Sequence, residues 1–107
     1  MSTTATTSRL VVDAGPVADA AEILVHESTL ASHVIFTTSG YTTEITMDPD
    51  GVPFELWGSG TQALWRLLSA IAYTRHEVSL YEVVSRLDSH NRAAVAAAIA
   101  ALCGVNR

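Results

Sequence analysis

Residues 78–106 read VSLYEVVSRLDSHNRAAVAAAIAALCGVN, and this stretch predicts two short helices joined by a tight corner. Ser79 followed three residues later by Glu82 is a capping box, which satisfies free backbone N–H groups where a helix begins. Asp88 or Ser89 can cap the second helix, and Gly104 is expected to end it. Helix–corner–helix units either contact DNA or close a small core, so the role of this stretch depends on the rest of the chain.

Residues 33–47 predict a β-hairpin. They are rich in β-branched and aromatic residues, and Ser39-Gly40 in their middle supplies a turn residue that tolerates positive φ. Along residues 41–47, successive side chains are expected to point alternately to the two faces of the strand. We therefore expect one face of the hairpin to meet the core and the other to meet solvent.

Two further segments are candidates for strands. Residues 48–51 are a turn signature, Asp-Pro-Asp-Gly, and residues 52–57 after them are expected to form an edge strand. Pro53 restricts that strand to an edge because proline has no N–H to donate to a neighbouring strand. Residues 10–12 are a shorter β-prone run, and whether they join the sheet is left open.

Helical spacing of apolar residues predicts two more helices. Residues 17–26 fit an amphipathic helix with Pro16 in its first turn, and we favour this helix over a strand. Leu64, Leu67 and Leu68 belong to an apolar stripe that predicts a second helix over 61–74.

These elements predict a single α+β domain over residues 9–107, preceded by a disordered tail over 1–8. Its architecture is a small antiparallel sheet, made of hairpin 33–47 plus an edge strand, packed against a C-terminal three-helix segment. A chain of 107 residues is long enough to bury one modest core without disulfides.

Composition excludes several mechanisms. The chain has a formal net charge of -5, and its 6 basic residues are all arginine, so no Walker A loop or lysine Schiff base can form. The single cysteine, Cys103, cannot make an internal disulfide, and its place at the end of an apolar helix predicts a buried, inert thiol. The N-terminus has no signal-peptide pattern and the longest apolar run is too short to span a bilayer, so we expect a cytoplasmic protein.

No local pattern predicts catalysis, a metal site or a cofactor. The four histidines lack a second ligand at helical spacing, and they are His26, His33, His76 and His90. Residues 58–61, Gly-Ser-Gly-Thr, precede a helix and can hold an anion there, but a dinucleotide site also needs a strand after that helix. We therefore expect no enzyme activity, no cofactor, no metal and no small-molecule substrate.

The C-terminal helix pair resembles a winged helix-turn-helix in outline, over about thirty residues. This resemblance implies the alternative function, a transcriptional regulator that contacts DNA through residues 79–104. Only three side chains at the start of the second helix could reach base edges, namely His90, Asn91 and Arg92. The rest of that helix is rich in alanine, no wing strands follow it, and the net charge is acidic, all of which disfavour DNA as a partner.

Residues 60–72 (GTQALWRLLSAIA) and 79–104 (SLYEVVSRLDSHNRAAVAAAIAALCG) resemble small uncharacterised proteins of actinobacteria and their bacteriophages. The positions that match are Leu87, Asp88, Asn91, Val95, Ala98 and Gly104. The resemblance spans about half the chain and implies no known activity, but it suggests a phage accessory or host-interaction role. The exclusive use of arginine also points to a GC-rich genome.

Our leading functional hypothesis is a non-enzymatic protein-interaction protein that binds a protein partner or forms a homodimer. Aromatic and small residues of its helical half define the candidate partner surface, which comprises Trp57, Trp65, Tyr73, Tyr81, Ala93, Ala97 and Ala100. The alternative for the tryptophans is that they fill the space between sheet and helix. The alanine face fits either a tight contact within the chain or a homodimer.

Overall fold

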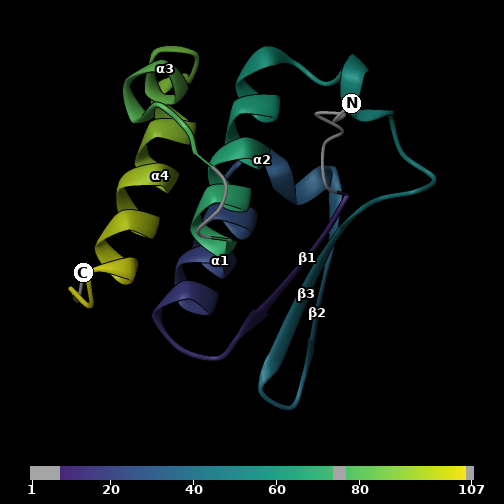
Figure 1. Ribbon diagram of the computed structural model, residues 1–107. Coiled ribbons are helices and arrows are strands. Elements are labelled where there is room, and N and C mark those ends of the chain that lie inside the picture. The colour runs from purple at the N-terminus through teal and green to yellow at the C-terminus, as the bar shows by residue number, and fades with distance from the viewer. Residues whose placement is uncertain (1–7, 74–76, 106–107) are drawn as a thin grey trace.

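The computed structural model describes residues 8–73 and 77–105. Most of the predicted tail over 1–8 lies outside this range. Figure 1 shows three layers: the sheet, then α1 with α2, then the C-terminal helices. The strands and helices, in chain order, are β1 (Arg9–Asp13), α1 (Pro16–His26), β2 (Val34–Ser39), β3 (Thr42–Met47), α2 (Ser59–Ala72), α3 (Leu80–Ser85) and α4 (Ser89–Leu102).

The predicted α+β class and hairpin are confirmed. The three strands are antiparallel in the order β1-β3-β2, so β1 and β2 form the two edges of the sheet. Gly40 follows β2 with a φ of 61°, a value that the first loop residue of a type II′ hairpin turn requires and that favours glycine. Thr43 and Ile45 are buried, whereas their β3 neighbours on the opposite face are half-buried, as the alternation predicts.

The predicted edge strand over residues 52–57 is wrong. Phe54–Leu56 forms a single 3-10 turn, η2, and the Trp57 indole N–H donates to the Val52 carbonyl oxygen at 2.8 Å. This bond folds the segment back on itself and places the indole in the core, so the backbone does not extend along the sheet. The third strand is β1 instead, which contains the short run at 10–12.

The helices before residue 73 start close to their predicted positions. α1 confirms the helix favoured for 17–26, with Pro16 at a first-turn position where a missing N–H costs no helical bond. α2 starts two residues earlier than predicted and ends at Ala72, while Thr74 lies outside the described residues. Leu64 and Trp65 are adjacent in α2 yet both fully buried, because α2 packs against β1, α1 and α3 on several sides.

Both predicted caps of the C-terminal pair are present. The Ser79 hydroxyl accepts the Glu82 N–H at 3.3 Å at the start of α3, and the Asp88 carboxylate accepts the Asn91 N–H at 2.9 Å at the start of α4. Loss of such a cap typically costs about 1 kcal/mol of stability. These short helices therefore begin where the sequence sets their caps.

The end of α4 corrects one prediction. Gly104 has a φ of 77°, and its N–H and that of the next residue return to carbonyls in the last turn of the helix, which is a Schellman motif. Cys103 immediately precedes it and is exposed, so the predicted buried thiol is wrong. The cysteine is the C-cap residue and lies beyond the last fully buried residue of α4, Ala98.

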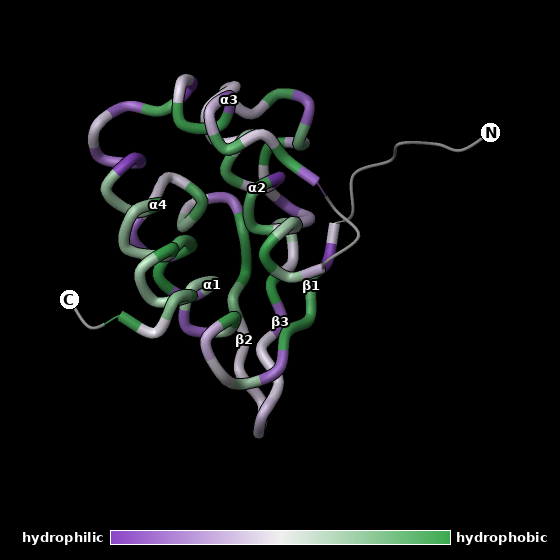
Figure 2. The backbone as a smooth tube through the Cα atoms, turned by 60° about the vertical axis from the view of Figure 1, so that its left-hand side comes forward, coloured by the Kyte–Doolittle hydropathy of each residue, from purple (hydrophilic) through white to green (hydrophobic). Residues whose placement is uncertain are grey.

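One hydrophobic core joins all these elements. Its largest fully buried side chains come from the sheet, α1, α2 and the loop after α1. Figure 2 shows the hairpin tip in pale colours, in contrast to the more hydrophobic helices above it. No helix within residues 8–73 and 77–105 is long and apolar enough to cross a membrane.

Candidate functional site

The structure places both tryptophans of the predicted partner surface in the core. Trp65 is 0% exposed and Trp57 is 6% exposed, with their rings 6.3 Å apart in an edge-to-face arrangement. Trp57 also contacts the rings of His33 and Phe54, at 4.8 and 5.0 Å. The alternative prediction, that the tryptophans fill the gap between sheet and helix, is therefore the one that holds, and neither ring is available to a partner.

The two tyrosines of that predicted surface have different environments. Tyr73 is half-buried after α2, and its hydroxyl accepts the Val11 N–H at 3.1 Å. Tyr81 is 82% exposed on α3. Only Tyr81 is thus displayed to solvent, while Tyr73 has a role within the sheet.

The alanine face of α4 is largely used inside the chain. α4 packs mainly against α1, and the buried α4 positions include Ala94, Ala97 and Ala98 opposite the buried Ala20 and Ala21 of α1. Small side chains on both helices permit this close approach. Of the predicted surface, Ala97 is therefore buried, Ala100 is half-buried and Ala93 is exposed. The intramolecular alternative accounts for the face without a second copy.

Two of the three predicted DNA contacts are engaged in the fold. Asn91 is 5% exposed; its amide oxygen accepts the Thr29 N–H at 3.0 Å, and its amide nitrogen lies 3.4 Å from the Thr29 hydroxyl. The Arg92 guanidinium donates to the Val84 carbonyl at 3.1 Å, which holds the end of α3 against the start of α4. Only His90 is exposed with no such bond, so the prediction that Asn91 could meet a base is wrong.

The glycine-rich loop before α2 serves packing. A Cβ on Gly60 would lie 2.9 Å from the Arg86 carbonyl oxygen, so glycine lets the start of α2 approach the end of α3. The described residues contain no group of three or more His, Cys, Asp or Glu side chains able to hold a metal ion.

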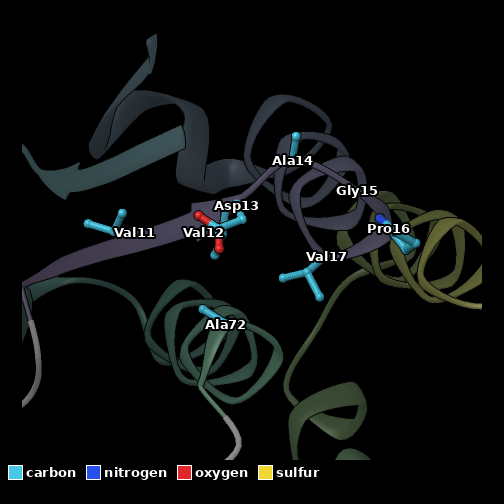
Figure 3. A pocket seen from close by; sticks show the side chains of 8 residues that line it. All are labelled: Val11, Val12, Asp13, Ala14, Gly15, Pro16, Val17 and Ala72. Atoms are coloured by element: carbon cyan, nitrogen blue, oxygen red, sulfur yellow. The ribbon is translucent and has the colours of Figure 1, made fainter. Parts of the chain in front are cut away.

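Figure 3 shows a hollow of about 300 Å³ between the β1–α1 loop and the end of α2. Its walls are mostly aliphatic side chains and glycine, and Asp13 is the only charged residue among the described residues that line it. A general acid–base or nucleophilic site needs at least two convergent polar groups. The described residues that line this hollow supply no such pair.

The two edges of the sheet differ in how their backbone groups are satisfied. At the β1 edge, the Val11 N–H points away from β3 and is capped by the Tyr73 hydroxyl. Arg9 on the same strand pairs with Glu44 of β3 across the open face of the sheet. That hydrogen bond and ion pair lower the pKa of the Glu44 carboxyl. The middle of the β1 edge is thus capped by a side chain, and charged residues stand at both ends of the strand.

Two backbone hydrogen bonds establish which groups of β3 point to which neighbour. The Met47 N–H donates to the Ser8 carbonyl at 2.9 Å, and the Ala14 N–H donates to the Tyr41 carbonyl at 2.7 Å. Odd-numbered residues of β3 therefore direct their backbone groups at β1. Because these directions alternate along an antiparallel strand, the even-numbered residues direct theirs at β2.

The register then shows that β2 has an open edge. Glu44 of β3 lies opposite Thr37, so the odd-numbered residues of β2 bond to β3. The backbone N–H and C=O groups of Phe36 and Thr38 point away from the sheet, and no hydrogen bond between residues of the described chain reaches those groups. Unpaired edge groups of this kind are a template for another strand.

β2 also lacks the features that usually protect an edge. Its sequence, VIFTTS, contains no charge, no proline and no glycine, and Figure 2 shows no strongly hydrophilic colour along it. Ile35 is 48% exposed on the outer face, and Phe36 is half-buried on the face toward α1.

A second hollow lies beside this open edge. It measures about 190 Å³ and is bounded by α1 on one side and the hairpin on the other. Phe36, Thr38 and Tyr41 from the hairpin line it, together with Asp19 and Glu22 from α1. We call it the α1–hairpin hollow.

Sequence reasoning missed the β2 edge because it assigned the outer position to residues 52–57. With that strand beside the hairpin, one edge would have been occupied. The signal that could have identified the edge is the uncharged run in β2. Comparison with protein-family models, with curated proteins and with solved structures gives no match for this chain.

Proposed function

We propose that this chain is a non-enzymatic protein-interaction module that binds its partner by adding an extended segment to the open edge of β2. The observation that carries the proposal is the contrast between the two edges of one sheet. The outward N–H of Val11 in β1 is capped by Tyr73, whereas Phe36 and Thr38 present N–H and C=O groups that no described residue bonds, beside the exposed side chain of Ile35. Such an edge supplies main-chain hydrogen bonds for affinity and side-chain contacts for specificity.

The rest of the described molecule supports an interaction role over catalysis. Among the described residues, the hollow near Asp13 has a single charged group, and the aromatic cluster around Trp57 is closed inside the core. The surface proposed here also replaces the tryptophan and alanine surface as the place of contact. A role in a phage or its host is consistent with this function and remains part of the proposal.

Strand addition is tested by selecting binders and mapping where they bind. A display library of random ten-residue peptides would be selected against the wild-type protein, with counter-selection against Thr38→Pro. Proline at position 38 removes an outward N–H that the fold does not use, so the variant loses the edge without losing a ladder bond. We expect selected peptides to bind the wild type with micromolar affinity, roughly the range of a short strand without deep pockets.

The same peptides should shift the backbone NMR resonances of β2 and leave those of β1 unchanged. Binding that is indifferent to Thr38→Pro, or resonance shifts confined to α3 and Tyr81, would contradict strand addition. A library that yields no binder above the level seen with Thr38→Pro would contradict it as well.

A further inference from the structure

We infer that the segment accepted by β2 is basic, with arginine or lysine at the alternate positions that face α1. This inference rests on the proposed function and names the chemistry of its partner. It follows from the position of two acidic side chains beside the open edge, from the absence of charge in β2, and from the aromatic groups between them.

An added strand presents its side chains alternately to the two faces of the sheet. On the outer face they meet Ile35 and Thr37, which are exposed and uncharged. On the inner face they enter the α1–hairpin hollow. The partner therefore needs two different sets of side chains, and the hollow determines one of them.

Asp19 and Glu22 determine the charge of that inner set. They lie three residues apart on α1, so they share a face of the helix, and both are exposed and line the hollow with Phe36 and Thr38. No ion pair or hydrogen bond from another described residue reaches either carboxylate. Two unpaired negative charges beside unpaired backbone groups favour a cationic segment.

The spacing suits long basic side chains. Asp19 and Glu22 are about 4.5 Å apart along the axis of α1, at 1.5 Å per residue. Alternate residues of a strand are about 6.8 Å apart, and a flexible arginine or lysine stem accommodates the difference. Tyr41, 85% exposed at the rim, and Phe36 within the hollow also offer ring faces to a guanidinium.

The same charges disfavour a second copy of this chain as the occupant. Pairing β2 with β2 of a second copy would continue the sheet and bring both α1 helices to the same side of it. Each α1 would then carry Asp19 and Glu22 toward a protein whose own formal net charge is -5. β2 contributes no positive charge to offset this repulsion.

The test uses three synthetic nine-residue peptides that alternate valine with a second residue. That residue is arginine in the first peptide, citrulline in the second and glutamate in the third. Citrulline keeps the shape of arginine without its charge. Affinities would be measured by calorimetry against the full chain, the double variant Asp19→Asn/Glu22→Gln, and the edge variant Thr38→Pro.

A matched double variant, Glu55→Gln/Glu77→Gln, removes two charges from residues that do not line the hollow. We expect the arginine peptide to bind the wild type at least about ten-fold more tightly than the citrulline peptide, the effect of a few partly screened ion pairs. The hollow variant should reduce that ratio to about two-fold or less, whereas the matched variant should keep most of it. The glutamate peptide should have the lowest affinity of the three.

Other outcomes would contradict the basic partner alone or both the basic partner and strand addition. If citrulline binds as well as arginine and Thr38→Pro abolishes both, strand addition stands and the basic partner is wrong. If the arginine peptide binds Thr38→Pro as tightly as the wild type, the attraction is a non-specific charge effect and both proposals fail. If no peptide binds, both fail too. A stable dimer in sedimentation that Thr38→Pro dissociates would make a second copy the occupant and overturn the basic partner.

Discussion

The two edge strands of this small sheet differ in whether their outward backbone groups have partners and in the charge they carry. β1 and β2 each pair with β3 on one side, and each has an unpaired side. On β1 the outward Val11 N–H meets the Tyr73 hydroxyl, and Arg9 and Asp13 put charge at the strand ends. On β2 the outward groups of Phe36 and Thr38 meet no described partner, and the strand has no charge.

An open edge in this fold is therefore a specific feature of one strand. The residues that cap β1 come from the end of α2, far along the chain, so the protection arises from the helical arrangement. No described residue reaches the β2 edge in this way, because α1 approaches that strand on its inner face, where His26 contacts the Phe36 ring at 4.8 Å. The edge of β2 is therefore left available for a partner.

The largest expected effect is a difference in stability between proline substitutions on the paired side and on the open side of β2. Thr37→Pro removes an N–H that bonds to β3 and should reduce the free energy of unfolding by about 3 kcal/mol. Thr38→Pro, one residue further, removes an outward N–H and should cost about 1 kcal/mol or less. Chemical denaturation of both variants measures the contrast. Equal losses at the two positions would mean that the assigned hydrogen-bond alternation is wrong.

Opening the covered edge should have the next largest effect. Tyr73→Phe removes the hydroxyl that accepts the Val11 N–H and should cost about 1 kcal/mol, the usual net value of such a bond. Hydrogen exchange at Val11 should become faster at the same time, approaching the rate of an open edge. Tyr81→Phe is the control, since that exposed hydroxyl has no role in the sheet. Unchanged exchange at Val11 would show that Tyr73 does not protect β1.

A charge placed on the open edge should have a small effect on stability and a large one on binding. Ile35→Lys changes an exposed side chain, so the free energy of unfolding should move by less than about 0.5 kcal/mol. Lysine at an edge discourages strand pairing, so affinity for selected peptides should fall several-fold. A loss of stability well above this limit would show that Ile35 is packed, and undiminished binding would place the contact elsewhere.

Much of this fold follows from local signals. The caps at Ser79 and Asp88 and the turn at Gly40 each act through bonds within a few residues, so the sequence alone predicts where α3 and α4 begin and where the hairpin turns. The third strand could not be predicted in this way. Its position depends on Trp57 folding back onto the Val52 carbonyl and on β1 pairing with β3 from thirty residues away.

The candidate site was less predictable for the same reason. Trp57 and Trp65 have the composition of a binding surface, but the helix that carries Trp65 is buried on several sides. Asn91 looks available to DNA until Thr29 is seen to occupy its amide. The open edge of β2 exists only because of the strand order, which depends on contacts between distant segments.

The smallest expected effect concerns the charged pair at the covered edge. Arg9 lowers the pKa of Glu44 through a hydrogen bond and an ion pair, so Arg9→Gln should raise that pKa toward its ordinary value. A depressed pKa in the folded state means that the pair contributes to stability above the unfolded pKa of about 4.3 and loses that contribution as pH falls through the folded value. NMR titration of the Glu44 side chain in both proteins measures the shift. An identical pKa of Glu44 with and without Arg9 would show that this ion pair does not lower it.

Amide hydrogen exchange of β2, measured by NMR with and without the valine–arginine peptide, shows whether β2 is an open edge that accepts a strand. In the free protein the amides of Phe36 and Thr38 should exchange quickly while that of Thr37, which bonds to β3, should exchange slowly. With the peptide bound, the Phe36 and Thr38 amides should become protected and the β1 amides should stay as they were. Protection of Phe36 and Thr38 already present in the free monomer, or no change on binding, would contradict the claim that β2 is an open edge that accepts a strand.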